Sequence, residues 1–197
     1  MTDTTTRPEL TMPKAEAAVL RAAYAAASVI LEYGTGGSTL MAAEMPGKTI
    51  FAVESDRRWL SMMRDWIAAN PGGSTVHLHQ ADIGATRRWG HPRNEVRWRQ
   101  FADYPLGVWD RDDFRHPDVV LIDGRFRVGC FLATMLRTSR PVTVLFDDYA
   151  PRPAYRAVEE WFAPVAITGR MAQFQVTPVT LNPAHLRRVI ALTQEPA

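Results

Sequence analysis

The feature that most constrains the fold of this chain is an alternation of short apolar runs with longer segments of helical pattern. The apolar runs cover residues 28–32, 49–53, 75–79, 118–122 and 141–146, and the helical segments include 14–27, 127–138 and 154–162. Apolar runs alternating with helices are typical of buried parallel strands covered on both faces. Residues 173–176 and 188–192 are expected to add a closing antiparallel pair. The sequence therefore predicts an α/β fold, doubly wound on a mostly parallel seven-stranded sheet with helices on both faces.

The length of 197 residues suits one domain, which we expect to span residues 13–197. Residues 1–12 are polar and rich in Thr, and they are expected to form a flexible tail. The segment 87–113 interrupts the alternation and interleaves tryptophans with arginines. A long segment without a clear element is often functional. A lid over the substrate, a dimer face and a rigid surface loop are all compatible with it. Interleaved aromatics and arginines also suit single-stranded nucleic acid, which the net charge of +2 makes the least favoured alternative.

Composition excludes several classes of protein. The net charge of +2 is too balanced to indicate nucleic acid as a partner, so a small-molecule substrate is expected. A single cysteine, Cys130, allows no intrachain disulfide and favours a cytoplasmic location. No run of about 18 apolar residues indicates a membrane span. Neither zinc-ligand spacing nor a Walker A motif occurs. The composition is also compatible with a homodimer.

Acidic residues stand at or just beyond the ends of the predicted strands. Glu32, Glu54, Asp123 and Asp147 each end a strand, and Asp82 follows the third one. The carboxyl ends of parallel strands lie along one edge of a sheet, where ligands bind at the point of reversed strand order. Carboxylates gathered in a crevice repel one another and lose water, so a ligand, a metal or hydrogen-bond donors must offset them.

A glycine-rich loop follows the first strand and carries the strongest local signal, Glu32-Tyr33-Gly34-Thr35-Gly36-Gly37-Ser38-Thr39. Glycines allow a tight turn and a close approach to a ligand, and the next helix offers free N–H groups at its start. Thr39 occupies the position of the third glycine in a dinucleotide-binding fingerprint. This departure weighs against an NAD(P)-dependent oxidoreductase, which remains a less favoured alternative.

The Glu-x-Gly-x-Gly pattern after a first strand resembles motif I of the class I S-adenosylmethionine (SAM)-dependent methyltransferases. The resemblance spans roughly Ala15 to Leu192 and implies a Rossmann-like methyltransferase fold with SAM as cofactor. It implies that the glycine loop holds the methionine end, that Glu54 holds ribose hydroxyls and that Asp82-Ile83 reads the adenine edge. The cofactor-binding residues that follow are Glu32, Gly34, Thr35, Gly36, Ser38, Thr39, Glu54, Ser55, Asp82 and Ile83.

Three aspartates after the fourth and fifth strands resemble the acids of metal-dependent O-methyltransferases. Asp123, Asp147 and Asp148 form a plausible oxygen-ligand set for Mg²⁺, and a metal would activate an acceptor hydroxyl. In the alternative, Arg125 or Arg127 neutralises these acids and no metal binds. Asp123 then acts as a general base directly, and Arg125 is the second candidate catalytic residue.

Arginines near the crevice suggest the nature of the substrate. Arg125 and Arg127 are candidates to hold an anionic group in a bidentate manner, whereas Arg152 is expected to be ordinary surface charge. The run Ile122 to Arg127 also resembles a group of bacterial methyltransferase-like proteins. The function predicted is O-methylation of a small anionic or polyhydroxy substrate. The alternative on the same fold is a catalytically silent SAM-binding protein that works by interaction.

Overall fold

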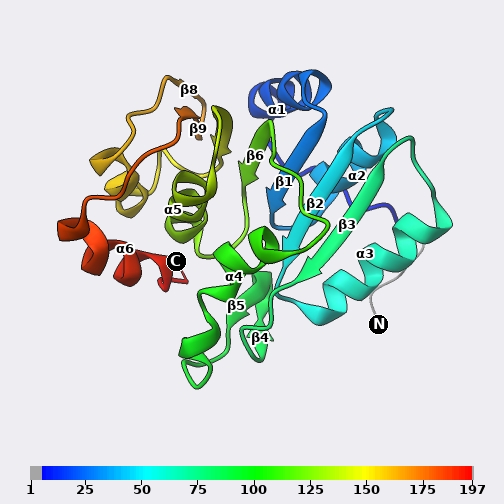
Figure 1. Cartoon of the computed structure of the whole chain (residues 1–197). Helices are drawn as coiled ribbons and strands as arrows, with labels where there is room; N and C mark the ends of the chain where they lie inside the picture. The colour runs from blue at the N-terminus through cyan, green and yellow to red at the C-terminus, as the bar shows by residue number, and fades with distance from the viewer. Residues whose placement is uncertain (1–5, 197) are drawn as a thin grey trace.

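The computed structural model describes residues 6–196 and is built around a single large sheet (Figure 1). The sheet has seven strands in the order β3-β2-β1-β6-β7-β9-β8. Their bounds are β1 Val29–Tyr33, β2 Thr49–Glu54, β3 Thr75–Gln80, β6 Val119–Ile122, β7 Val142–Phe146, β8 Ala166–Thr168 and β9 Met171–Val176. The first five of these strands are parallel to one another, and β9 is antiparallel to both of its neighbours, β7 and β8. This architecture confirms the predicted doubly wound fold.

Helices cover both faces of the sheet because alternate strand residues point to opposite sides. They are α1 Lys14–Ala26, α2 Gly37–Glu44, α3 Arg57–Ala69, α4 Asp103–Leu106, α5 Arg127–Arg137 and α6 Leu186–Thr193. In β6, Val119 and Leu121 pack on the side of α1 and α2, whereas Val120 and Ile122 pack on the side of α5 and α6. Within residues 6–196, no helix combines the length and apolarity that crossing a bilayer requires.

Of the two strands predicted to form a closing antiparallel pair, one is correct and the other is wrong. Residues 173–176 lie in β9, but the strand beside β9 at the sheet edge is β8, and residues 188–192 belong to α6. In α6, Val189 and Leu192 are buried whereas Ile190 is exposed, which is a helical spacing rather than a strand alternation. The expected helix over 154–162 is a 3₁₀ helix at Pro153–Glu160.

The N-terminal segment lies partly outside the described residues, which begin at residue 6. From residue 7 to residue 12 it is held against the domain. Arg7 pairs with Glu44 at 3.0 Å, and Met12 is buried in the core. The backbone of residues 9 and 10 packs so closely on α2 that a Cβ on Gly37 would lie 2.3 Å from it. The expectation of a loose tail does not describe this part of the segment.

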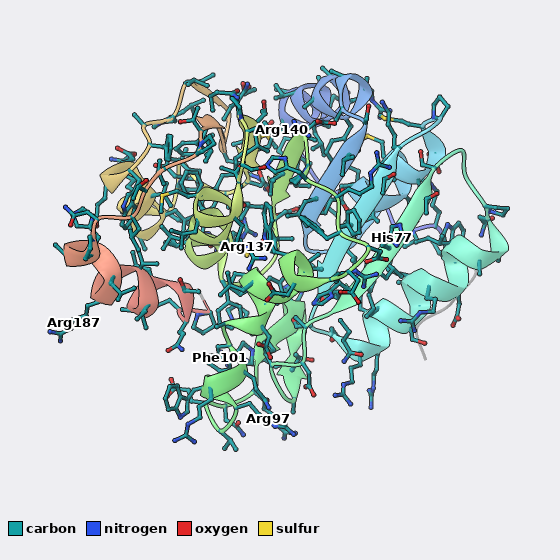
Figure 2. The ribbon with its side chains drawn as sticks, in the orientation of Figure 1. His77, Arg97, Phe101, Arg137, Arg140 and Arg187 are labelled. Carbon is teal, nitrogen blue, oxygen red and sulfur yellow. The ribbon has the colours of Figure 1, made fainter. Side chains whose placement is uncertain are left out.

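The insertion at 87–113 combines a small hairpin with short helical turns. The hairpin strands are β4 Thr86–Arg87 and β5 His91–Pro92, and the turns include Trp98–Gln100 and Gly107–Asp110. Its second half joins the core through Phe101, Tyr104 and Trp109, whereas Trp89 is 72% exposed. The hairpin lies beyond the carboxyl ends of the parallel strands, and Arg97, in the segment after the hairpin, lies at the outer end of the insertion (Figures 1 and 2). The second half of the insertion is therefore part of the core, whereas the hairpin projects over the edge where ligands bind.

Candidate active site

The glycine loop joins β1 to α2 and lies against the loop that follows β6. Gly34 has a left-handed φ of +105°, and a Cβ on it would lie 3.0 Å from the backbone of Gly124. The backbone N–H of Gly36 donates a hydrogen bond of 3.0 Å to Oγ1 of Thr39. The loops after β1 and β6 are thus in direct contact at the point where the strand order reverses, which is the ligand-binding position in such folds.

Glu32 is completely buried behind this loop. The Tyr24 hydroxyl donates to its Oε1 at 2.5 Å, and the Thr39 hydroxyl donates to its Oε2. Burial raises the pKa of the Glu32 carboxyl to about 7, although these hydrogen bonds oppose the change. Glu32 therefore ties α1 and α2 to the end of β1. Direct contact of this carboxylate with a cofactor stays a prediction.

Glu54 links the end of β2 to the glycine loop. Its Oε1 accepts from the backbone N–H groups of Ser55 and Asp56 at 2.7 and 2.8 Å. Its Oε2 accepts from the Thr35 hydroxyl at 3.2 Å. The Ser55 hydroxyl donates to the carbonyl of Gly90 at 2.9 Å, so the hairpin insertion rests on this corner of the site. Burial raises the pKa of Glu54, and the backbone donors oppose this shift.

The acid beyond β3 is accessible. Asp82 pairs with Arg57 at 2.9 Å, and Ile83 beside it is buried. The loops after β1, β2 and β3 therefore bring all the predicted cofactor-binding positions to one edge of the sheet. The contact of each with SAM remains a prediction.

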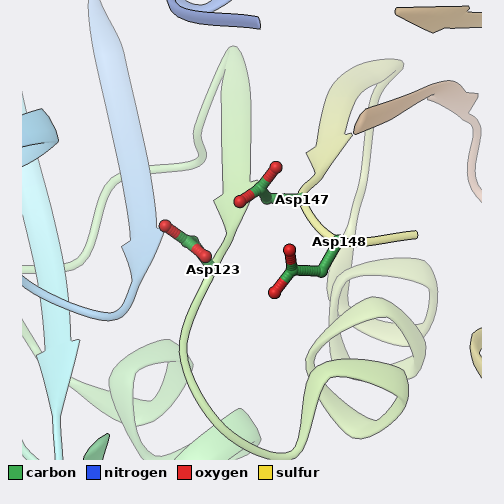
Figure 3. A group of neighbouring side chains, drawn as sticks. All are labelled: Asp123, Asp147 and Asp148. Carbon is green, nitrogen blue, oxygen red and sulfur yellow. The ribbon is translucent and has the colours of Figure 1, made fainter. Parts of the chain in front are cut away.

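The three predicted metal-ligating aspartates also come together (Figure 3). One carboxylate oxygen from each of Asp123, Asp147 and Asp148 lies within 4.8 Å of the others. The Asp147 side chain is fully buried, whereas the side chains of Asp123 and Asp148 are 37% and 19% exposed. Asp123 thus offers the most accessible carboxylate of the three.

Arginines neutralise this cluster. Arg127, only 3% exposed, lies 3.1 Å from Asp123 and 3.3 Å from Asp148. Arg170 holds both oxygens of Asp147 at 3.0 and 2.7 Å, and Arg152 lies 3.0 Å from Asp148. Three guanidinium groups therefore face three carboxylates. The cluster fits a Mg²⁺ ion poorly, because a cation would have to displace guanidinium groups from its ligand oxygens.

Asp123 keeps an unusual electrostatic environment despite these partners. Partial burial in the crevice raises its pKa to about 6, with Asp147 and Asp148 adding to the shift and Arg127 opposing it. A carboxylate with such a pKa is suited to accept a proton near neutral pH.

Comparison with known proteins identifies the family. No protein-family model matches the chain, and no curated protein matches it. The structure of a methyltransferase-like protein (spo2022) from Silicibacter pomeroyi DSS-3 has 56% sequence identity and a TM-score of 0.93, over 96% of this chain and 99% of that one. The chain belongs to the class I SAM-dependent methyltransferase superfamily. The predicted family, fold and enzyme class are thereby confirmed.

A more distant structure shares the fold of this methyltransferase. The O-methyltransferase TomG from Streptomyces achromogenes, solved in complex with SAM, has 17% identity and a TM-score of 0.56. The match covers 86% of this chain and 82% of TomG.

Several site residues of the methyltransferase gave no signal in the sequence. Tyr24 holds Glu32, Arg170 holds Asp147, and His91 contacts Arg125. Each of these pairs joins different elements, so no local spacing marks it. Arg125 itself does not neutralise the acid cluster, and of the two candidates only Arg127 does so.

The buried Glu32 predicts a pH-dependent stability. Its pKa of about 7 in the folded state exceeds the ordinary value of 4.5, so the folded protein binds more protons between these two values. The free energy of unfolding is therefore expected to fall as pH rises through this window. Urea unfolding of the wild type and of Glu32→Gln across the window measures the effect. The fall should be reduced in the variant, and an equal fall in both proteins would exclude Glu32 as its source.

Proposed function

We propose that this methyltransferase transfers the methyl group of SAM to a hydroxyl oxygen of a small anionic or polyhydroxy acceptor. The observation that carries the proposal is the position of Asp123. This partly exposed carboxylate directly follows β6, one residue before the Gly124 backbone that contacts Gly34 of the glycine loop. A proton acceptor beside the glycine loop suits a reaction whose acceptor must be deprotonated as it attacks.

The residues of the strand-end loops fit SAM. The Gly34–Gly36 turn would hold the methionine portion, and Glu54 with Ser55 would receive the ribose. Asp82 and Ile83 combine an exposed carboxylate with a buried apolar side chain, which suits the edge and face of an adenine ring. The shared fold of TomG, which was solved with SAM, supports this assignment. When bound, SAM supplies an electrophilic methyl group, so the protein mainly has to position and deprotonate the acceptor.

Asp123 would perform the deprotonation. Its carboxylate would accept the proton of the acceptor hydroxyl as that oxygen takes up the methyl group. The S–CH₃ bond would break with its electron pair staying on sulfur, so that S-adenosylhomocysteine leaves. Arg127 holds Oδ1 of Asp123 at 3.1 Å and fixes the orientation of the carboxylate. The guanidinium also keeps the neighbouring acids compensated, so that the crevice needs no metal for charge balance. We derive no step through Mg²⁺, because the aspartate oxygens are engaged by arginines.

Calorimetric titration with S-adenosylhomocysteine, with and without Mg²⁺ and with NADH as the control ligand, tests this proposal. We expect micromolar binding of S-adenosylhomocysteine, an unchanged affinity in Mg²⁺ and no saturable binding of NADH. An affinity for S-adenosylhomocysteine that rises strongly with Mg²⁺ would contradict the proposal that the site works without a metal. Absence of S-adenosylhomocysteine binding by folded protein would overturn the assignment as a SAM-dependent enzyme.

A further inference from the structure

Arg125 differs from the other arginines of the crevice because it is buried without an acidic partner. Its exposed fraction is 9%. Arg127, Arg152 and Arg170 each pair with one or more aspartates, whereas within residues 6–196 no carboxylate forms an ion pair with Arg125. Burying an unpaired charge is costly, so proteins seldom keep one without a ligand to offset it.

The free part of this guanidinium is well defined. Nη1 of Arg125 lies 2.6 Å from Nε2 of His91, which accepts the hydrogen bond. Nε is buried and has no hydrogen-bond partner in the described part of the chain. The Nε–H points in the same direction as one N–H of Nη2, and together they form an edge that matches two oxygens of one oxyanion. The hydrogen bond to His91 uses Nη1 and therefore does not involve the donors of this edge.

Two other arginines of this chain use the same Nε–Nη2 edge to bind a carboxylate. Arg170 uses Nε and Nη2 to bind the two oxygens of Asp147 at 3.0 and 2.7 Å. Arg111 binds Asp113 in the same way at 2.8 and 2.7 Å. Arg125 presents the equivalent pair of donors, and no carboxylate of the described residues pairs with it.

The position of Arg125 connects it to the reaction. It lies two residues after Asp123, in the loop that contacts Gly34. A Cβ on Gly90 would lie 3.9 Å from Cγ of Arg125 and 3.2 Å from Oε1 of Glu54. The stem of Arg125 therefore lies near Glu54 at the predicted ribose site, and its backbone is two residues from the proton acceptor.

We propose that the Nε–Nη2 edge of Arg125 binds an oxyanion of the methyl acceptor, a carboxylate or a phosphate, with two parallel hydrogen bonds. The inference rests on the proposed function and decides between its two substrate classes. The acceptor is an acid that carries a hydroxyl group, and a neutral polyhydroxy compound lacks the group that this edge requires. Arg125 is then the residue that determines specificity, with Asp123 as the proton acceptor.

Arginine Nε–H resonances report this contact directly. We would titrate the ¹⁵N-labelled full chain with benzoate, inorganic phosphate and S-adenosylhomocysteine in separate experiments, at constant ionic strength and in slightly acidic buffer. The Arg125→Lys variant assigns the resonance by removing it. We expect benzoate or phosphate to shift the Arg125 signal saturably, and the tighter of the two identifies a carboxylate or a phosphate ligand.

Two variants measure how much Arg125 contributes to the affinity for benzoate or phosphate. Arg125→Gln is expected to lower the affinity of the protein for the anion by about tenfold or more, the loss typical of a charge-assisted bidentate contact. The matched control is Arg99→Gln, which removes the same charge from an exposed position of the insertion, over the Trp98 ring. It should leave the affinity unchanged. An equal loss in both variants would overturn the proposal, because it would indicate only a general effect of charge.

The remaining outcomes separate this inference from the proposed function. If neither anion shifts the Arg125 resonance, the oxyanion site is excluded even when S-adenosylhomocysteine binds. If S-adenosylhomocysteine shifts it and loses affinity more than about tenfold in Arg125→Gln, the edge holds the carboxylate of the cofactor and the inference is wrong. If anions bind and S-adenosylhomocysteine does not, the proposed methyl transfer fails while the oxyanion site stands.

Discussion

Replacing Asp123 with Asn is expected to lower kcat for methyl transfer by roughly 10²–10⁴-fold, the usual contribution of a general base. The amide keeps the shape of the side chain but cannot accept the proton. The affinity for S-adenosylhomocysteine should stay within about threefold of the wild type, because the loss belongs to the chemical step. Single-turnover methylation with a hydroxy-acid panel and calorimetry on the same preparation measure the two quantities.

The pH profile gives an independent check on this role. Because burial raises the pKa of Asp123 to about 6, kcat/KM of the wild type should rise with pH through that value as the base loses its proton. This rise of kcat/KM with pH should be absent in Asp123→Asn. Asp110→Asn, an equal change at an exposed ion pair with Arg137, serves as the control. Loss of S-adenosylhomocysteine binding in Asp123→Asn would instead assign this residue to the cofactor site.

Replacing Arg127 with Leu is expected to lower the free energy of unfolding by about 3–5 kcal/mol, as for other buried charge pairs that lose one partner. The guanidinium is 3% exposed, and it serves both Asp123 and Asp148. It also donates to the backbone carbonyl of Asp147 at 2.6 Å. The substitution therefore leaves the Asp123 carboxylate and a buried carbonyl without their donor, and it removes one of the three arginines beside Asp148. Chemical denaturation followed by far-UV circular dichroism measures the change.

Mg²⁺ distinguishes the neutralising role of Arg127 from simple packing. With Arg127 absent, Asp123 loses its guanidinium partner, whereas Arg170 still holds Asp147 and Arg152 still pairs with Asp148. Mg²⁺ should therefore raise the melting temperature of the variant through Asp123 and leave that of the wild type unchanged. The control is Arg188→Leu, which removes an exposed pair with Glu160 and should cost less than about 1 kcal/mol. Equal destabilisation by the two substitutions would show that the buried network contributes little.

The parts of this molecule that follow from local pattern could be predicted from the sequence. The run Val119–Ile122 is buried at every position, which is why it stands out as a continuous apolar segment. Asp56 caps α3 by accepting from the N–H groups of Arg58 and Trp59, as its place before a helix indicates. Near the C-terminus the same reasoning fails, because β-branched residues in a short amphipathic helix resemble a strand.

The charge pairing of the site could not be predicted in the same way. Arg125 and Arg127 flank Phe126, which adopts a left-handed conformation with a φ of 52°. This reversal lets one arginine reach the acids after β7 while the other meets the hairpin at His91. Phe126 is not a residue that signals such a turn. Which arginine neutralises the aspartates is therefore a property of the folded loop and of strands that are distant in sequence.

The turn between β8 and β9 has a consequence for the biosynthesis of this chain. Asp147 emerges from the ribosome 23 residues before Arg170, the side chain that binds both of its oxygens. A nascent chain that ends at β7 therefore carries a carboxylate destined for full burial and lacks its counter-charge. Asp147 can be buried together with its counter-charge only after the chain has been translated at least as far as Arg170. The order of synthesis thus delays completion of the crevice until almost the whole chain is available.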